Sequence, residues 1–228
     1  ESLHDAPLSI SAFSSQDLVD IGATTLEDIS LRTPGLQYNG VLAGQFAGRG
    51  STTIRFRGMH SAAQQLGTVF VDGIPVMGGL SGLGLGDLER IEVIKGPQSA
   101  FFGRSTFGGA INYITKDPGD EFAGKISVEA ASMGQYDVSI SHEGPILPGT
   151  LSYRISGRSY HRDGPFRSYV DQGKMGEQST DSIAAAIVYT PTDNFSVKAR
   201  VMQYEDEDGA PAGGLIEAPL HNCWADNG

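Results

Sequence analysis

Apolar and polar side chains alternate with a period of two in five separate segments of the second half of the chain. This period predicts β-strands with one apolar and one polar face, because successive side chains of a strand point to opposite sides of a sheet. With their flanking residues the segments have about the 9 to 11 residues that a tilted strand needs to cross a bilayer. The alternation is clearest at 125–130, 136–141, 151–158, 182–190 and 195–201.

The connections between these segments differ in length. Short ones follow the second and fourth segments, at 145–149 and 191–193, and long ones follow the third, at 163–181, and the fifth, from Glu207 onward. The first connection, at 132–135, is also short. Outer-membrane barrels place short turns on the periplasmic side and longer loops outside, so the pattern favours an up-and-down sheet of that kind. A soluble β-sandwich is the alternative, because alternation alone is typical of both.

The first half of the chain mixes short predicted strands and helices with glycine-rich loops. Ser15 is a candidate N-cap for a first helix, and Thr25 with Asp28 forms a candidate capping pair for a second. Asp72-Gly73 has the composition of a hairpin turn. The predicted helices cover 16–21 and 26–31, and the predicted strands cover 7–13, 52–58, 68–76 in two parts, 88–95 and 110–116. This order predicts an α+β domain with a small mixed sheet.

Residues 88–116 read LERIEVIKGPQSAFFGRSTFGGAINYITK and join two β-rich runs through a compact, glycine-rich turn. Glycines followed by Arg104-Ser105 invite comparison with a phosphate-binding loop. However, Gly96 and Gly103 are seven residues apart rather than five, and Arg104 stands where that loop carries lysine. We therefore reject a nucleotide site.

This stretch instead closely resembles the end of the plug domain of TonB-dependent outer-membrane receptors. Two further stretches are similar to the same family, IRFRG at 54–58 and VFVDGIPV at 69–76. The resemblance implies that residues 1–121 are an α+β plug domain, with a small mixed sheet and short helices. It implies that residues 122–228 are the first five or so antiparallel strands of a transmembrane β-barrel of about 22 strands.

The same resemblance implies that the TonB box lies upstream of residue 1 and that the remaining strands lie beyond Gly228. The expected function is active import of a scarce nutrient across the bacterial outer membrane, first of all a ferric siderophore or similar iron complex. Cobalamin, haem, a glycan or another small organic nutrient is the alternative substrate, and a passive porin or surface-binding protein is the alternative function. The implied partners are TonB with ExbB and ExbD, and we expect a monomeric barrel in the lipid bilayer.

Two groups of candidate site residues follow from the resemblance. Upward-facing plug loops are expected to contact the small-molecule ligand through Gln45, Phe46, Arg49, His60, Gln64, Gln65 and Met77. Charges within the plug strands are expected to make ionic contacts with the barrel wall, namely Arg57, Glu89, Glu92 and Lys95. A solvated sheet face is the alternative interpretation of these four charges. In the family, position 95 is more often arginine.

Composition excludes several other classes of function. The net charge of -11 argues against a nucleic-acid partner, which needs a clustered basic face. The five histidines lack metal-ligand spacing, and no set of side chains suggests catalysis, so we expect no metal, no cofactor and no enzyme. The acidic run at 205–208 is interpreted as solvated rather than calcium-binding. The single cysteine, Cys223, is expected to form a loop disulfide with a cysteine beyond the end of this sequence, and a free or surface thiol is the alternative.

Overall fold

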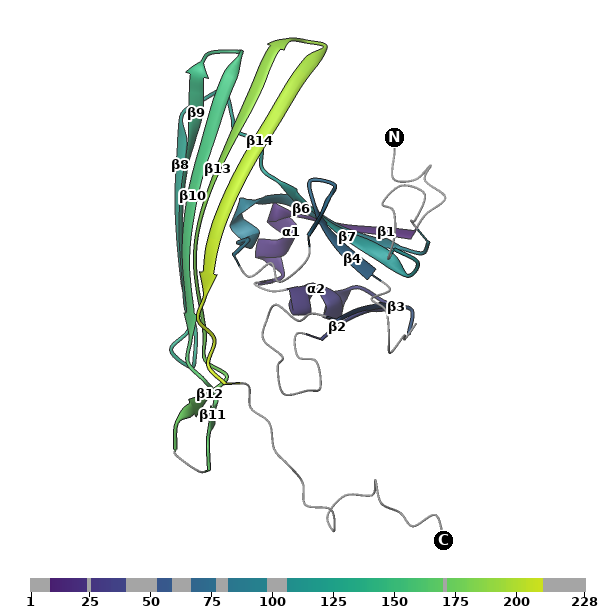
Figure 1. Ribbon diagram of the computed structural model, residues 1–228, viewed down its shortest axis with the longest axis vertical. Coiled ribbons are helices and arrows are strands. Elements are labelled where there is room, and N and C mark those ends of the chain that lie inside the picture. The colour runs from purple at the N-terminus through teal and green to yellow at the C-terminus, as the bar shows by residue number, and fades with distance from the viewer. Residues whose placement is uncertain are drawn as a thin grey trace.

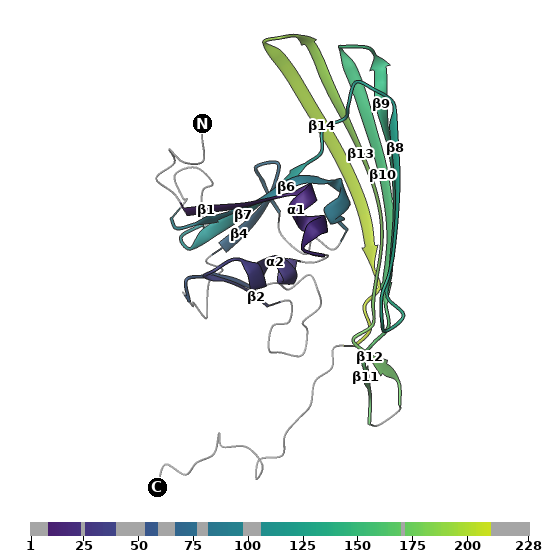
Figure 2. The same cartoon turned by 180° about the vertical axis from the view of Figure 1, so that it is seen from behind.

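The computed structural model describes residues 9–23, 26–39, 53–58, 67–76, 82–97, 106–169 and 172–210. These residues form an N-terminal α+β domain that lies beside one face of a tall sheet, as the two opposite views show (Figures 1 and 2). The fold class expected from the sequence, an α+β domain followed by antiparallel strands, is confirmed.

The N-terminal domain is built on a mixed five-stranded sheet in the order β1-β6-β7-β4-β5. Its neighbouring strands are antiparallel except β4 and β7, which run parallel. These strands are β1 (Ser9–Ser14), β4 (Gly67–Val71), β5 (Ile74–Val76), β6 (Leu88–Lys95) and β7 (Gly109–Thr115). A separate pair joins β2 (Leu36–Asn39) to β3 (Thr53–Phe56). The sequence analysis missed β2, because four residues after a Pro-Gly pair are too few to show a period.

Two short helices cover this domain, α1 (Ser15–Asp20) and α2 (Leu26–Arg32). The predicted cap of the first helix was wrong by one residue. Ser14 is the N-cap, since its hydroxyl accepts a hydrogen bond from the Asp17 amide at 3.2 Å while the Asp17 carboxylate accepts from the Ser14 amide at 2.8 Å. This reciprocal box needs a carboxylate three residues after the cap, a condition that Ser14 meets and Ser15 does not. Thr25, the predicted cap of α2, lies outside the described residues.

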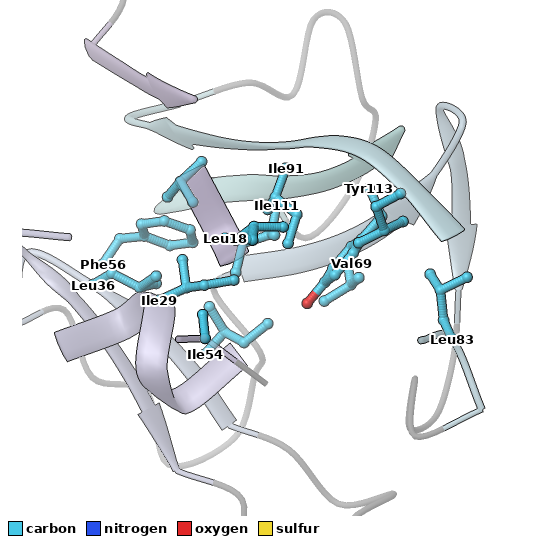
Figure 3. Close-up of a cluster of buried hydrophobic side chains, with 13 residues drawn as sticks. Leu18, Ile29, Leu36, Ile54, Phe56, Val69, Leu83, Ile91, Ile111 and Tyr113 are labelled. Atoms are coloured by element: carbon cyan, nitrogen blue, oxygen red, sulfur yellow. The ribbon is translucent and has the colours of Figure 1, made fainter. Parts of the chain in front are cut away.

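The core of the domain lies between the mixed sheet, the β2–β3 pair and the helices (Figure 3). Phe56 and Ile111 are fully buried there, as is Ile29 of α2. Helices this short are marginal in water, so burial of their apolar side chains stabilises them. Burying each such side chain contributes about 1.5 to 3 kcal/mol.

Two turns of the domain reach toward the tall sheet. Asp72 and Gly73 join β4 to β5, and both have positive φ angles, 49° and 79°, which fits the predicted Asp-Gly hairpin turn. The second is a 3-10 turn, η1 (Leu85–Asp87), which leads directly into β6.

The tall sheet is antiparallel, in the order β14-β13-β10-β9-β8. Its strands are β8 (Ala123–Ala130), β9 (Tyr136–Leu147), β10 (Leu151–Arg162), β13 (Gln178–Thr192) and β14 (Phe195–Asp206). A two-stranded extension, β11 (Phe166–Arg167) with β12 (Lys174–Met175), projects from the long connection between β10 and β13 (Figure 1). All five predicted strands are therefore present, and the short and long connections fall where the sequence placed them.

The two faces of the tall sheet differ in character. One face exposes a row of large apolar side chains, among them Ile126 at 70%, Ile183 at 59% and Val201 at 68%. The other face, called the inner face from here on, carries polar and charged side chains and lies against the N-terminal domain. In the described ranges, no helix is long and apolar enough to span a membrane.

Candidate functional site

The junction between the N-terminal domain and the inner face is held by ionic contacts. Asp87, the last residue of η1, accepts a hydrogen bond from Arg154 of β10, whose Nη2 lies 2.9 Å from Asp87 Oδ1. Ser156 of β10 donates a hydrogen bond to the other carboxylate oxygen. Arg200 of β14 adds a third contact, its Nη2 lying 3.8 Å from Asp87 Oδ2. One carboxylate of the N-terminal domain thus meets two strands of the sheet.

Arg154 is well placed to hold this contact. Its side chain is only 8% exposed, and its Nη1 donates to Glu143 of the neighbouring strand β9 at 2.5 Å. Glu143 and Arg154 are also direct partners in the strand register. A charge this deeply buried is stable only when it is paired, and Arg154 therefore requires both carboxylates.

A second contact involves Lys198 of β14. Its Nζ lies 3.1 Å from Asp72 in the β4–β5 turn and 2.7 Å from Asp117, and it donates to Thr115 Oγ1 at 2.9 Å. Asp72 in turn accepts hydrogen bonds from the amide and hydroxyl of Thr115, at 2.9 and 2.6 Å. One lysine of the sheet therefore fixes a turn of the N-terminal domain and the end of its strand β7.

These contacts lower the pKa of the Asp72 carboxylate. Burial raises its pKa, but the hydrogen bonds from Thr115 and the charge of Lys198 outweigh burial and hold the pKa below the ordinary value of 3.8. The turn therefore carries a negative charge at neutral pH. Nearby, Lys116 donates to the carbonyl of Gly86 at 2.8 Å, and its pKa is lowered by burial and by the positive charge of Arg154.

A cavity of about 230 Å³ lies between α1, η1 and the inner face of β8 to β10. Gln16 and Val19 line it from the helix, and Lys125, Ser139 and Arg158 line it from the sheet. Sites for small molecules usually measure about 300 to 1,000 Å³. The cavity is therefore smaller than a usual small-molecule site, and it marks the boundary between the N-terminal domain and the tall sheet.

Comparison with known proteins identifies the two bodies. Residues 2–110 match the model of the TonB-dependent Receptor Plug Domain. Residues 2–110 are therefore identified as a plug domain of the TonB-dependent receptor type. The plug domain is the N-terminal domain described above, and the five-stranded sheet is called the wall from here on.

Individual relatives agree with this assignment. The pesticin receptor of Yersinia pestis is 30% identical over 147 residues, which are 63% of this chain and 21% of the receptor. The ferrioxamine B receptor of Salmonella typhimurium is 24% identical over 217 residues, 92% of this chain and 29% of that protein. The chain thus spans between a fifth and a third of the length of these relatives.

A solved structure shows the same fold. The ferric yersiniabactin uptake receptor FyuA from Yersinia pestis superposes with a TM-score of 0.76 at 24% identity, over 86% of this chain and 31% of that one. The match includes more residues than the plug alone contains, so the wall shares the fold of that receptor as well. The expected location, the bacterial outer membrane, agrees with this family.

The predicted site residues fall into two groups. All seven predicted ligand contacts lie outside the described residues: Gln45, Phe46, Arg49, His60, Gln64, Gln65 and Met77. The four charged residues predicted to contact the barrel wall are called the lock residues from here on: Arg57, Glu89, Glu92 and Lys95. The structure describes all four, and they lie in the plug. Their contacts with the barrel stay a prediction.

The neighbours of the four lock residues are themselves plug residues. Glu89 and Glu92 both pair with Arg90, at 2.5 and 2.8 Å, and Lys95 donates to the carbonyl of Pro34 at 3.3 Å. Arg57 is exposed in the turn that ends β3, where its φ angle is 51°. These charges organise the plug surface in the described part of the chain.

The ionic contacts between plug and wall involve residues that sequence reasoning did not select. The period-two pattern placed Arg154, Lys198 and Arg200 on the polar face of their strands, and this placement is right. It gave no sign of their partners, because Asp72 and Asp87 looked like ordinary turn residues. The signal available in the sequence was a lysine or arginine on the polar face of a strand that follows another domain. Among the described residues, no group of three or more His, Cys, Asp or Glu side chains is placed to hold a metal.

Proposed function

We propose that this protein imports a ferric siderophore, or a similar iron complex, across the bacterial outer membrane. The observation that carries the proposal is the plug itself, seated on the wall by ionic contacts at Asp72 and Asp87. The relatives reported above are named for pesticin and ferrioxamine B, and the similar structure for ferric yersiniabactin. Their names support an iron chelate as the first substrate class to test.

The proposed active step is movement of the plug, not bond chemistry. The supporting observation is that Asp87 and Asp72 hold the plug against the wall through Arg154 and Lys198. Opening a path requires the Asp87–Arg154 and Asp72–Lys198 contacts to break, and breaking buried ion pairs costs free energy. We propose that TonB, with ExbB and ExbD, supplies that energy, and that no catalytic group takes part.

The domain boundaries are part of the proposal. We assign residues 1–121 to the plug and 122–228 to the first strands of a monomeric barrel of about 22 strands. Strand β7 ends at Thr115 and β8 begins at Ala123, which supports a boundary between them. The exposed apolar face of the wall is proposed to meet lipid.

The loop and lock residues named in the sequence analysis also remain proposals. We assign ligand contact to the seven loop residues and contact with the rest of the barrel to Arg57, Glu89, Glu92 and Lys95. The variant Arg57→Glu tests the lock, because reversed charge would repel the acidic partners that arginine attracts. We expect cells carrying it to admit large antibiotics, whereas unchanged permeability would count against the lock.

Uptake of radiolabelled iron tests the function. Cells expressing the receptor should accumulate ferric siderophore, and a proton uncoupler should abolish accumulation without reducing binding to the cell surface. Import that persists with the uncoupler would show a passive porin instead. No uptake of iron, together with uptake of labelled cobalamin, haem or a glycan, would assign one of the other substrates.

A further inference from the structure

The positive charge of the wall is confined to one face. All six lysine and arginine residues of the five wall strands occupy inner-face positions, as the strand registers show: Lys125, Arg154, Arg158, Arg162, Lys198 and Arg200. Four carboxylates share that face: Glu129, Asp137, Glu143 and Asp206. Six cations against four carboxylates leave a net charge of +2, in a chain whose total is -11.

The cations follow a column along β10. Arg154, Arg158 and Arg162 recur every four residues, which spaces them about 13 Å apart at roughly 3.3 Å per residue. Arg158 is held by Asp137 of β9, with Nη2 2.6 Å from the carboxylate. The buried Nε atom of Arg162 has no hydrogen-bond partner in the described part of the chain. The column runs along most of the length of the strand.

At rest, carboxylates of the plug cover the end of this column that lies nearer the β9–β10 turn. Asp87 sits on Arg154 and Arg200, and Asp72 sits on Lys198. The side chains of Arg154 and Arg200 are only 8% and 13% exposed as a result. Movement of the plug would remove these carboxylates and expose the cations, leaving Glu143 on Arg154 and an excess of positive charge that attracts another anion.

We infer that the inner-face cations of β10 and β14 form a track for an anionic iron chelate, with the plug carboxylates occupying it in the resting state. The inference rests on the proposed import function and adds its substrate class. A negatively charged chelate would replace Asp87 and Asp72 on the cations that they release. An uncharged chelate would gain no electrostatic attraction from these cations.

The variant for the test is Arg158→Gln with Arg162→Gln, because both cations lie on the column and the carboxylate described on Arg158 is Asp137 of the wall. Lys174→Gln is the matched control, since it removes a cation from β12 on the extension and leaves the wall intact. Arg158→Lys with Arg162→Lys keeps the charge and tests whether charge, rather than shape, is needed. The probes are a ferric tris-catecholate complex, which is anionic, and an uncharged ferric trihydroxamate complex.

The expected result is that the glutamine double variant imports the anionic complex roughly tenfold more slowly, the lower end of what charge steering gives. Import of the uncharged complex, the lysine double variant and the Lys174→Gln control should stay near the rates of the unaltered receptor. An equal loss for both complexes, no loss for either, or an unaltered receptor that imports only the uncharged complex would overturn the inference. Import of neither complex by the unaltered receptor would overturn the proposed function, and the inference with it.

Discussion

Asp87 and Arg154 lie 67 residues apart in the sequence, yet their side chains meet at 2.9 Å across the junction of plug and wall. Asp87 ends the 3-10 turn that precedes β6, and Arg154 lies in the first half of β10. The pair therefore couples β6, a strand of the mixed sheet of the plug, to the wall. Any movement of the plug away from β10 must first break this contact.

Replacing Asp87 by asparagine should loosen the plug. Arg154 would keep Glu143 but lose half of its charge compensation, and we expect a coupling free energy of about 1 to 3 kcal/mol between the two positions. A double-mutant cycle of Asp87→Asn and Arg154→Gln, followed by unfolding of the purified receptor, measures this value. Asp20→Asn is the control, because Asp20 is exposed on α1 and its carboxylate accepts a hydrogen bond from Gln16 of the same helix at 2.7 Å. A coupling near zero would mean that the pair does not hold the plug.

The Asp72 contact should make plug stability depend on pH. Because the folded-state pKa of Asp72 lies below its ordinary value of 3.8, its contribution is complete above about pH 5 and is lost as the pH falls through the ordinary value and then the lower folded value. Asp72→Asn should therefore reduce the loss of stability between about pH 5 and about pH 3. Thermal unfolding at several pH values checks this, with Asp193→Asn in the exposed β13–β14 turn as the control. Identical acid profiles for Asp72→Asn and the control would contradict the assignment.

Gly109 at the start of β7 should not tolerate a side chain. Its φ angle is 153°, and a Cβ atom there would collide with the backbone oxygen of Ile94 and lie 2.9 Å from the ring of Phe56. Gly109→Ala should cost about 1 to 3 kcal/mol of stability, the usual range for overpacking. Gly86→Ala is the matched control, since a Cβ at Gly86 meets nothing within 4 Å. Equal unfolding temperatures for the two variants would show that β7 can adjust.

Helix α2 offers a matched pair for the core. Ile29 is fully buried, whereas Leu31, two residues further on, is 79% exposed. Ile29→Ala should destabilise the plug by about 2 to 5 kcal/mol, and Leu31→Ala should change its stability by less than about 0.5 kcal/mol. Denaturant unfolding of both variants measures the difference. Similar losses for both would mean that the exposed face of α2 is covered in the assembled receptor.

Much of this fold was readable from the sequence, because two features are local. The Asp-Gly turn at 72–73 and the period-two wall strands depend only on neighbouring residues, and both predictions are confirmed. Strand β2 could not be predicted, since its four residues become a strand only by pairing with β3. The N-cap of α1 was misplaced because two serines stand side by side, and only the partner carboxylate of Asp17 selects Ser14.

The junction between plug and wall was harder to predict for the same reason. The polar face of β10 identified Arg154 as inward-facing, but its partner Asp87 comes from a turn that has no distinguishing pattern. Lys198 meets Asp72 and Asp117, which lie more than 80 residues away in the chain. Contacts of this range depend on the docking of two bodies, and a single sequence does not encode them as a local pattern.

The central claim is that the plug must leave the wall for import, and a disulfide across the junction tests it most directly. Asp87→Cys with Ser156→Cys, in a background where Cys223 is replaced by serine, places two thiols where the side chains now form a hydrogen bond. We predict that the oxidised receptor still binds ferric siderophore but does not import it, and that reduction restores import. Import at an unchanged rate, with the disulfide shown to be fully formed, would contradict the account.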